Sequence, residues 1–423
     1  MQRRRLWWLR LDFGMRASIY ALAFFLPFSV SGSQIALGVM IVLQLAIWGV
    51  TRKVGWRWDP LYVPLALFLG GVFVSMLFSI DPALSWIKGS KYWIVAIYFL
   101  VINHLYEERR VRTCLLILVY TTAAVAVYSV IFQHFLGLDP LRVLASPTKL
   151  FQKTGSYYHA VGLFDHHLTY GNSLMIVLFL ALALIVSSRS HWERILLGAG
   201  FLVTLAGLFY SYARGPWLGF LAGCFLYGYV KGRRVLVLLL AVALLAGAAF
   251  YMGSDSVRHR IRTIFDSNLN VERIITWQTT MEMIKDYPVV GLGPGVYRRI
   301  CWNYRDGYNV HFTSESHAHN AYLQVWAESG LFGFVPYVLV LVVFLYYGVR
   351  RMYDKLTPQP ARELTLGGVA AVMAFCVAGL FQHNLGDAEV AMLVWFVAAI
   401  VLRKDRRTHV ELGYLEMSVR EKT

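Results

Sequence analysis

VLVLLLAVALLAGAAFYM, residues 235–252, contains no charged side chain over eighteen positions. A helix of about twenty apolar residues is what crosses the hydrocarbon core of a bilayer, so this stretch predicts a membrane-spanning helix. Similar runs recur along the whole chain, at 18–32, 33–50, 60–79, 92–106, 113–135, 168–187, 195–210, 216–230, 331–349, 366–384 and 390–402. We therefore predict an all-α, polytopic membrane protein with about twelve transmembrane helices.

The composition agrees with a membrane protein. Of 423 residues, 58% are hydrophobic and 15% are charged, whereas soluble domains carry about 25% charged residues. The net charge of +16 does not indicate a nucleic-acid-binding protein, because the basic residues lie between apolar runs. The four cysteines form no paired spacing and predict neither disulfides nor a zinc site.

Lysine and arginine are unevenly divided between alternate loops. Twenty-six lie in one set: 1–17, 51–59, 107–112, 189–194, 231–234, 350–363 and 403–423. Fourteen lie in the other set, which comprises 80–91, 136–167, 211–215, 253–330 and 385–389. Eight of those fourteen fall in the long loop 253–330, and long loops cross the membrane regardless of charge. The short loops therefore predict that both termini lie in the cytoplasm. We also predict that the first helix is retained in the protein.

The predicted organisation has four parts. Residues 1–252 form a bundle of about nine helices with an extracytoplasmic loop at 136–167. Residues 253–330 form a large extracytoplasmic loop, 331–402 the last three helices, and 403–423 a cytoplasmic tail. Long loops often carry function. Within the large loop, the helical spacing of Ile274, Trp277, Met281 and Ile284 predicts a short amphipathic helix.

The segment SHAHNAYLQVWAESGLFG, residues 316–333, is the most informative for chemistry. His319 and Asn320 are followed by nine residues and then by Gly330 and Gly333. A histidine at a membrane surface can act as a general base near neutral pH. On spacing alone, the simpler interpretation is a solvated loop histidine beside a helix cap.

Two arginines could bind phosphate. Arg214 in YSYARGPW (210–217) stands between two apolar runs on the face poor in basic residues. Arg273 in NVERIITW (270–277) begins the amphipathic segment. A guanidinium offers five donors suited to phosphate oxygens. The alternatives are an arginine that reaches lipid headgroups and, for Arg273, a charge paired on a solvated surface.

Other motifs are weaker. The glycines of DYPVVGLGPG (286–295) predict a turn and not a nucleotide loop, because no strand precedes them and no GK[ST] follows. Asp165, His166, His167 and Asp387 are lesser candidates. HExxH, DxD and paired-cysteine patterns are absent from the sequence, so we predict no metal, and no GxSxG nucleophile occurs.

Together these features resemble the O-antigen ligase/polymerase superfamily. The His-Asn-x9-Gly-x-x-Gly signature falls on His319, and the arginine after a Ser/Thr-rich span end falls on Arg214. The arginine shortly before a tryptophan falls on Arg273, and a family-like stretch follows at 283–295. The family often has serine directly before its first arginine, whereas this chain has Ala213.

The resemblance implies a metal-independent, inverting glycosyltransferase of the GT-C-like, membrane-embedded type, with no cofactor. It implies a site on the periplasmic face of the bacterial inner membrane. Its donor would be O-antigen on undecaprenyl diphosphate, and its acceptor lipid A–core. His319 would be the general base, and Arg214 and Arg273 would hold the diphosphate. The supporting residues would be Asn320, His317, Asp387 and His167.

Three alternatives remain. An O-antigen polymerase or a protein O-oligosaccharyltransferase would use the same donor. A transporter or flippase of lipid-linked saccharides is disfavoured, because such proteins bury ionisable residues at mid-span or show inverted repeats. The sequence shows neither feature, and the candidate residues gather on one face.

Overall fold

The computed structural model describes residues 2–52, 58–141, 153–154, 157–253, 258, 267–305 and 317–403. The regular structure of these residues is helical apart from one small hairpin, in which β1 (Lys153–Thr154) pairs antiparallel with β2 (Tyr157–Tyr158). The prediction of an all-α, polytopic membrane protein is confirmed. The predicted tail, 404–423, lies outside the described residues, as do parts of both predicted extracytoplasmic loops.

The first half of the chain contains α1 (Gln2–Phe25), α2 (Val30–Thr51), α3 (Tyr62–Leu77), α4 (Pro82–Gly89), η1 (Ser90–Val95), α5 (Ala96–His104), α6 (Glu108–Tyr128), η2 (Ser129–Phe135), α8 (His167–Ser187) and α9 (His191–Tyr210). The second half contains α10 (Arg214–Lys231), α11 (Arg233–Gly253), α13 (Ser267–Asp286), α14 (Tyr297–Arg305), α15 (Ala321–Tyr353), α16 (Gln359–Gly379), η3 (Asn384–Gly386) and α17 (Ala388–Leu402).

Each of the twelve apolar runs overlaps helical structure. Seven helices in the described part of the chain are long and apolar enough to cross a membrane: α2, α6 with η2, α8, α9, α11, α15 and α16. Two shorter apolar helices are α3 and α17. The number of twelve spans stays a prediction.

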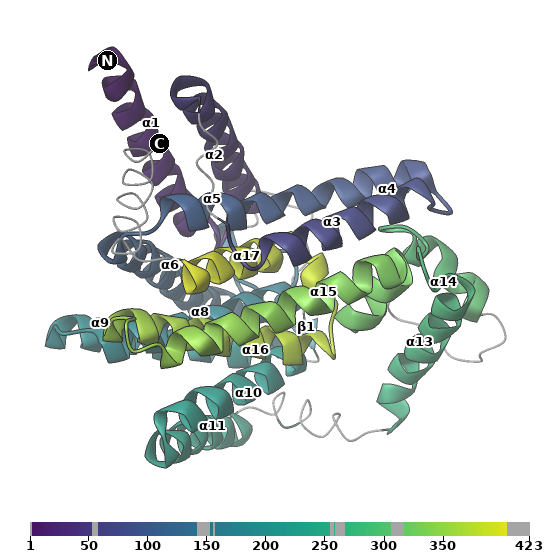
Figure 1. Cartoon of the computed structure of the whole chain (residues 1–423). Coiled ribbons are helices and arrows are strands. Elements are labelled where there is room, and N and C mark those ends of the chain that lie inside the picture. The colour runs from purple at the N-terminus through teal and green to yellow at the C-terminus, as the bar shows by residue number, and fades with distance from the viewer. Residues whose placement is uncertain are drawn as a thin grey trace.

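The bundle has an enclosed centre and an apolar outside. Helices α8 and α16 pack against each other and are largely buried, whereas α11 lies at the edge (Figure 1) and is almost wholly exposed. Its exposed residues include Val237, Leu244 and Leu245. An apolar side chain on the outside is favourable where the surroundings are lipid, so these exposed surfaces suit a membrane.

The boundary between the first two helices differs from the prediction. The sequence runs predicted a break between residues 32 and 33, but both residues lie inside α2. The turn occurs at 26–28, because Pro27 has no backbone N–H to donate and Ser29 caps the next helix. The Ser29 hydroxyl accepts a hydrogen bond from the backbone N–H of Gly32 at 3.0 Å.

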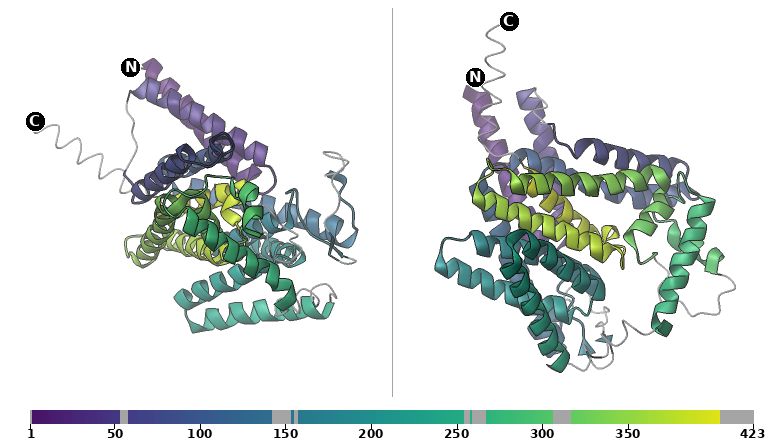
Figure 2. Two further views of the ribbon diagram at one scale, coloured as in Figure 1. Left: turned by 90° about the vertical axis from the view of Figure 1, so that its right-hand side faces the viewer. Right: turned by 60° about the horizontal axis from the view of Figure 1, so that its bottom comes forward.

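The helix predicted in the large loop is present as α13, and of its four predicted apolar positions Ile284 is buried. Ile274 and Met281 are exposed, whereas three threonines are buried. The Thr280 hydroxyl lies 2.6 Å from the hydroxyl of Tyr297 on α14. Hydroxyls that pair with one another can be buried at little cost, so hydropathy alone did not identify this face. Figure 2 shows α13 and α14 together at one end of the bundle.

Helix α15 bends where the large loop docks onto it. Gly330 has φ +56°, and its backbone conformation is not helical. At this bend the N–H groups of Leu331 and Phe332 donate to the carbonyls of Pro288 and Val289, at 2.9 and 3.2 Å. A Cβ at position 330 would lie 2.1 Å from the Val289 oxygen. The glycine therefore allows two backbones to touch.

Two adjacent glycines on α3 provide a test of close packing against α15. A Cβ on Gly71 would lie 1.9 Å from the carbonyl oxygen of Phe332, whereas one on Gly70 would meet nothing within 4 Å. We expect Gly71→Ala to lower the melting temperature of the detergent-solubilised protein. Gly70→Ala should leave it unchanged or raise it, because alanine favours a helix by about 0.5–1 kcal/mol over glycine. Equal melting temperatures for the two variants would contradict the packing described.

Candidate functional site

His319 lies in a tight turn directly before α15. Its φ is +50°, a left-handed conformation that is uncommon outside glycine. Its backbone N–H donates to Nδ1 of His317 at 3.1 Å. Both polar backbone groups of Ala318 are also held: its N–H donates to Gln324 at 2.7 Å, and its carbonyl accepts from the Trp277 indole at 3.0 Å. Packing and hydrogen bonds therefore fix the turn that presents the imidazole.

Asn320 begins α15. Its Oδ1 accepts from the backbone N–H groups of Tyr322 and Leu323 at 2.9 and 3.0 Å. This is the bonding of a helix N-cap, typically worth about 1 kcal/mol. The role of Asn320 in the structure is therefore to start the helix immediately after His319.

The His319 imidazole is held in its neutral form. Burial lowers its pKa to about 3, with further lowering by His317 and Arg273. Burial also lowers the pKa of His317 to about 4. Among the described residues, Nδ1 of His319 has no hydrogen-bond partner. The neutral imidazole therefore has a buried nitrogen that can accept a hydrogen bond.

Arg214 and Arg273 line the same cavity. Arg214 is the first residue of α10, and Arg273 lies on α13, fifty-nine positions later in the chain. The cavity has a volume of about 270 Å³, and its lining is Arg214, Gly215, Leu218, Arg273, Ile274, Trp277 and Phe381. Two guanidinium groups beside aromatic and aliphatic walls form a site suited to a phosphate-bearing amphiphile.

Trp277 connects this cavity to the histidine turn. Its side chain lines the cavity, and its indole N–H bonds the residue that precedes His319. Arg273 is also among the charges that lower the pKa of His319. The loop between α16 and α17 contacts both places, because Phe381 lines the cavity and the His383 ring lies 6.0 Å from that of His317.

These residues lie in a segment that resembles a known protein family. Residues 199–338 match the O-antigen ligase family. The match confirms the resemblance to the O-antigen ligase/polymerase superfamily and covers about a third of the chain. It contains both arginines, His319 and the two motif glycines. A comparison with curated proteins finds no match.

The two remaining supporting candidates lie outside the lining of the arginine cavity: His167 begins α8, and Asp387 directly precedes α17. Oδ2 of Asp387 accepts from the Thr169 hydroxyl at 2.9 Å, and burial raises the Asp387 pKa to about 7. The His167 ring lies 4.5 Å from that of His166, and His166 in turn lowers the pKa of His317. His167 is therefore connected to His319 only indirectly, through its contact with His166.

The segment that matches O-antigen ligases also borders an apolar cavity. Its volume is about 550 Å³, and it lies between α9, α10 and α11. The lining is Leu208, Phe209, Trp217, Phe220, Leu221, Ala243, Leu244, Gly247, Ala248, Tyr251 and Met252. Trp217 lies three residues after Arg214 on α10, so the two occupy neighbouring positions on one helix surface.

Sequence reasoning missed three polar residues near His319. Arg305 is buried, donates to the Thr276 hydroxyl at 3.1 Å and lowers the pKa of His319; no sequence signal distinguished it from other loop arginines. Gln324 and Glu328 are buried within the O-antigen ligase motif. Their spacing of four places two polar groups on one helix face, a signal that the sequence did contain.

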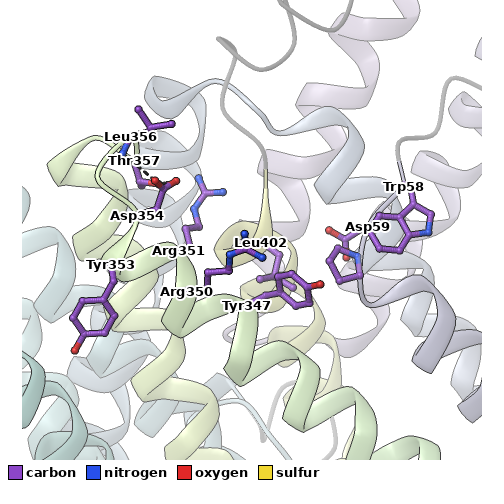
Figure 3. Close-up of a pocket in the computed structure, with 11 residues that line it drawn as sticks. Trp58, Asp59, Tyr347, Arg350, Arg351, Tyr353, Asp354, Leu356, Thr357 and Leu402 are labelled. Atoms are coloured by element: carbon purple, nitrogen blue, oxygen red, sulfur yellow. Dashed lines mark hydrogen bonds between the residues drawn. The ribbon is translucent and has the colours of Figure 1, made fainter.

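A larger cavity lies at the opposite end of α15. It has a volume of about 960 Å³, and its walls include Trp58, Arg350 and Tyr353 (Figure 3). The 23 residues of α15 after the bend at Gly330 (331–353) rise about 1.5 Å each and therefore extend roughly 35 Å from the bend. This cavity is therefore remote from His319. Separately, the described residues contain no group of three or more His, Cys, Asp or Glu side chains that could hold a metal ion.

Proposed function

We propose that this protein is an O-antigen ligase that transfers O-antigen polysaccharide from undecaprenyl diphosphate to lipid A–core. The family match supports O-antigen ligase/polymerase-type activity, and members of this family are glycosyltransferase-like enzymes. The observation that carries the proposal is the shared cavity of Arg214 and Arg273, joined through Trp277 to the turn of His319.

In this reaction a hydroxyl oxygen of the acceptor attacks C1 of the donor sugar. The bond between C1 and the diphosphate oxygen breaks, and the diphosphate leaves with the electron pair. Attack from the opposite face inverts the configuration at C1. Negative charge grows on the diphosphate as it departs, and Arg214 and Arg273 stabilise that charge. The donor is already activated by its diphosphate, so the transfer needs no nucleotide.

His319 accepts the proton of the attacking hydroxyl. Its lowered pKa keeps the imidazole neutral in the empty site, which is the form that accepts a proton. Arg273 contributes to that lowering. A bound diphosphate offsets the arginine charge and therefore raises the pKa of His319. Donor binding thus strengthens the base before the acceptor reacts.

The hydrocarbon of the donor fits the apolar cavity between α9, α10 and α11. Trp217 borders this cavity, while Arg214, one turn earlier on α10, lines the cavity for the diphosphate. A polyprenyl diphosphate is an anion joined to a long hydrocarbon. One helix therefore presents a basic site and an apolar site in the order that such a molecule requires.

Filling the apolar cavity should impair use of long-chain donors. A Cβ at Gly247 meets no atom within 4 Å, so Gly247→Phe adds bulk without a backbone clash. We expect about a tenfold rise in KM for the undecaprenyl donor, a loss of roughly 1.4 kcal/mol of binding. A donor with a short prenyl chain should be much less affected. The control is Gly198→Phe on α9. A Cβ at Gly198 also meets no atom within 4 Å, and this residue lies outside the cavity. Equal KM values for the two variants would contradict the assignment of the donor hydrocarbon to this cavity.

The site belongs to one end of the bundle, where α13 and α14 lie (Figure 1). The distribution of lysine and arginine assigns this end to the periplasm and both termini to the cytoplasm. The protein would therefore act in the bacterial inner membrane on substrates embedded in its outer leaflet.

Transfer by purified protein from defined undecaprenyl-diphosphate glycan to lipid A–core tests the proposal. A disruption strain separates the ligase from a polymerase. Free lipid A–core with polymerised O-antigen left on its carrier is expected for a ligase. A single repeat unit on the core would identify a polymerase instead.

A further inference from the structure

Gln324 connects the turn of His319 to the large loop. Its side chain is buried, with 2% exposed. Oε1 accepts from the backbone N–H of Ala318 at 2.7 Å, and Nε2 donates to Oε1 of Glu328 at 2.9 Å. One amide therefore bonds to the residue before His319 and to the carboxyl group one turn further along α15.

Glu328 is fixed independently of Gln324. Its Oε1 also accepts from the backbone N–H of Gly295 at 2.9 Å, and its backbone carbonyl accepts from the Ser75 hydroxyl at 2.6 Å and from Gly293 at 2.9 Å. The carboxyl is thus attached to the glycine turn of the large loop, while its backbone is bonded to α3.

These contacts determine which way the Gln324 amide faces. Oε1 of Glu328 already acts as an acceptor for Gly295, so it requires a donor from Gln324, and only the amide nitrogen can provide one. The Gln324 oxygen is then directed at the Ala318 N–H. In the opposite orientation, two oxygens would face each other at Glu328 and two donors would face each other at Ala318.

We propose that Gln324, oriented by Glu328, is a positioning residue that holds the His319 imidazole in its reactive geometry. The inference rests on the proposed transferase function of the same site. His319 has a left-handed backbone conformation, which persists in a residue other than glycine only where the surroundings enforce it. The hydrogen bonds that Ala318 donates to Gln324 and accepts from Trp277 supply that enforcement.

Gln324→Leu tests the proposal because leucine fills similar space without hydrogen bonds. We expect kcat to fall about ten- to a hundred-fold, since small misplacements of reacting groups have effects of up to that size. KM for the donor should stay within about twofold, because neither arginine is touched. Ser329→Ala is the control: it removes a buried hydroxyl on the same helix, which donates to the Val325 carbonyl at 2.6 Å, and it leaves the amide in place, so its kcat should stay near that of the wild type.

A double-mutant cycle separates positioning from general destabilisation. In a His319→Ala background, Gln324→Leu should have no further effect on the residual rate, because the group that it positions is gone. A general loss of structure would lower the residual rate again.

The outcomes distinguish this inference from the proposed function. Wild-type kcat in Gln324→Leu, together with an inactive His319→Ala, overturns the positioning role alone. An additive effect of the two substitutions also overturns it. Full activity of His319→Ala would overturn the proposed function, and with it the reason for positioning the imidazole.

Discussion

Replacing His319 with alanine is expected to reduce glycosyl transfer by about 10²- to 10⁴-fold, the usual contribution of a positioned general base. The substitution removes the proton acceptor and leaves both arginines, so donor binding should persist. Initial rates with purified protein at saturating donor measure the effect. His191→Ala is the matched control, because His191 is exposed at the start of α9, away from the site. A wild-type rate for the His319 variant would rule out the base.

The pH profile gives a second measure of the same residue. The acid limb of kcat/KM reports the free enzyme, and that of kcat reports the enzyme with substrate bound. Burial lowers the pKa of His319 in the free enzyme. The value of kcat/KM measured at neutral pH should therefore be retained well below pH 6.5. The diphosphate raises the pKa, so the acid limb of kcat should lie at higher pH. If the acid limbs of kcat and kcat/KM fell at the same pH, donor binding would not raise the pKa of His319, which would contradict this prediction.

Arg214→Lys and Arg273→Lys are each expected to reduce transfer by about 10²- to 10³-fold. Loss of one donor that stabilises a developing anion costs about 2.7–4 kcal/mol, and a lysine ammonium cannot reproduce the forked geometry of a guanidinium. Both arginines line one cavity, so each variant should weaken the same step. Single-turnover rates with the undecaprenyl-diphosphate donor measure the loss.

Another arginine of the large loop provides the control for these variants. Arg298 on α14 is exposed and does not line the cavity, so Arg298→Lys should keep the wild-type rate. If either Arg214→Lys or Arg273→Lys kept the wild-type transfer rate, the proposed binding of the diphosphate by these two arginines would be wrong. Activity that EDTA abolishes and Mg²⁺ restores would dismiss the metal-independent mechanism.

The helices could be predicted well because the membrane imposes one rule on all of them. An apolar run of bilayer length must be helical to satisfy its backbone, and every predicted run overlaps helical structure. Prediction failed where another interaction decided the structure. Pro27 and Ser29 moved the first boundary, and the buried threonine hydroxyls of α13 give no hydropathy signal.

The candidate site could be predicted only as separate motifs. Arg214, Arg273 and His319 were each found from their local sequence, and the structure brings the two arginines into one cavity. The connection through Trp277 and the orientation of Gln324 depend on contacts between distant segments. A single sequence carries no signal for such pairings, because several arrangements of the same helices would satisfy its hydropathy.

The backbone contact between residues 288–293 and α15 has a consequence for protein engineering. Four main-chain bonds form the joint: Leu292 to Ala327, Gly293 to Glu328, Leu331 to Pro288, and Phe332 to Val289. None of them depends on side-chain identity, provided that Gly291 and Gly330 remain glycine. Loop segments of equal length could therefore be exchanged between related enzymes at this seam. Chimaeras that keep these two glycines should assemble in register, while donor or acceptor preference follows the transplanted loop.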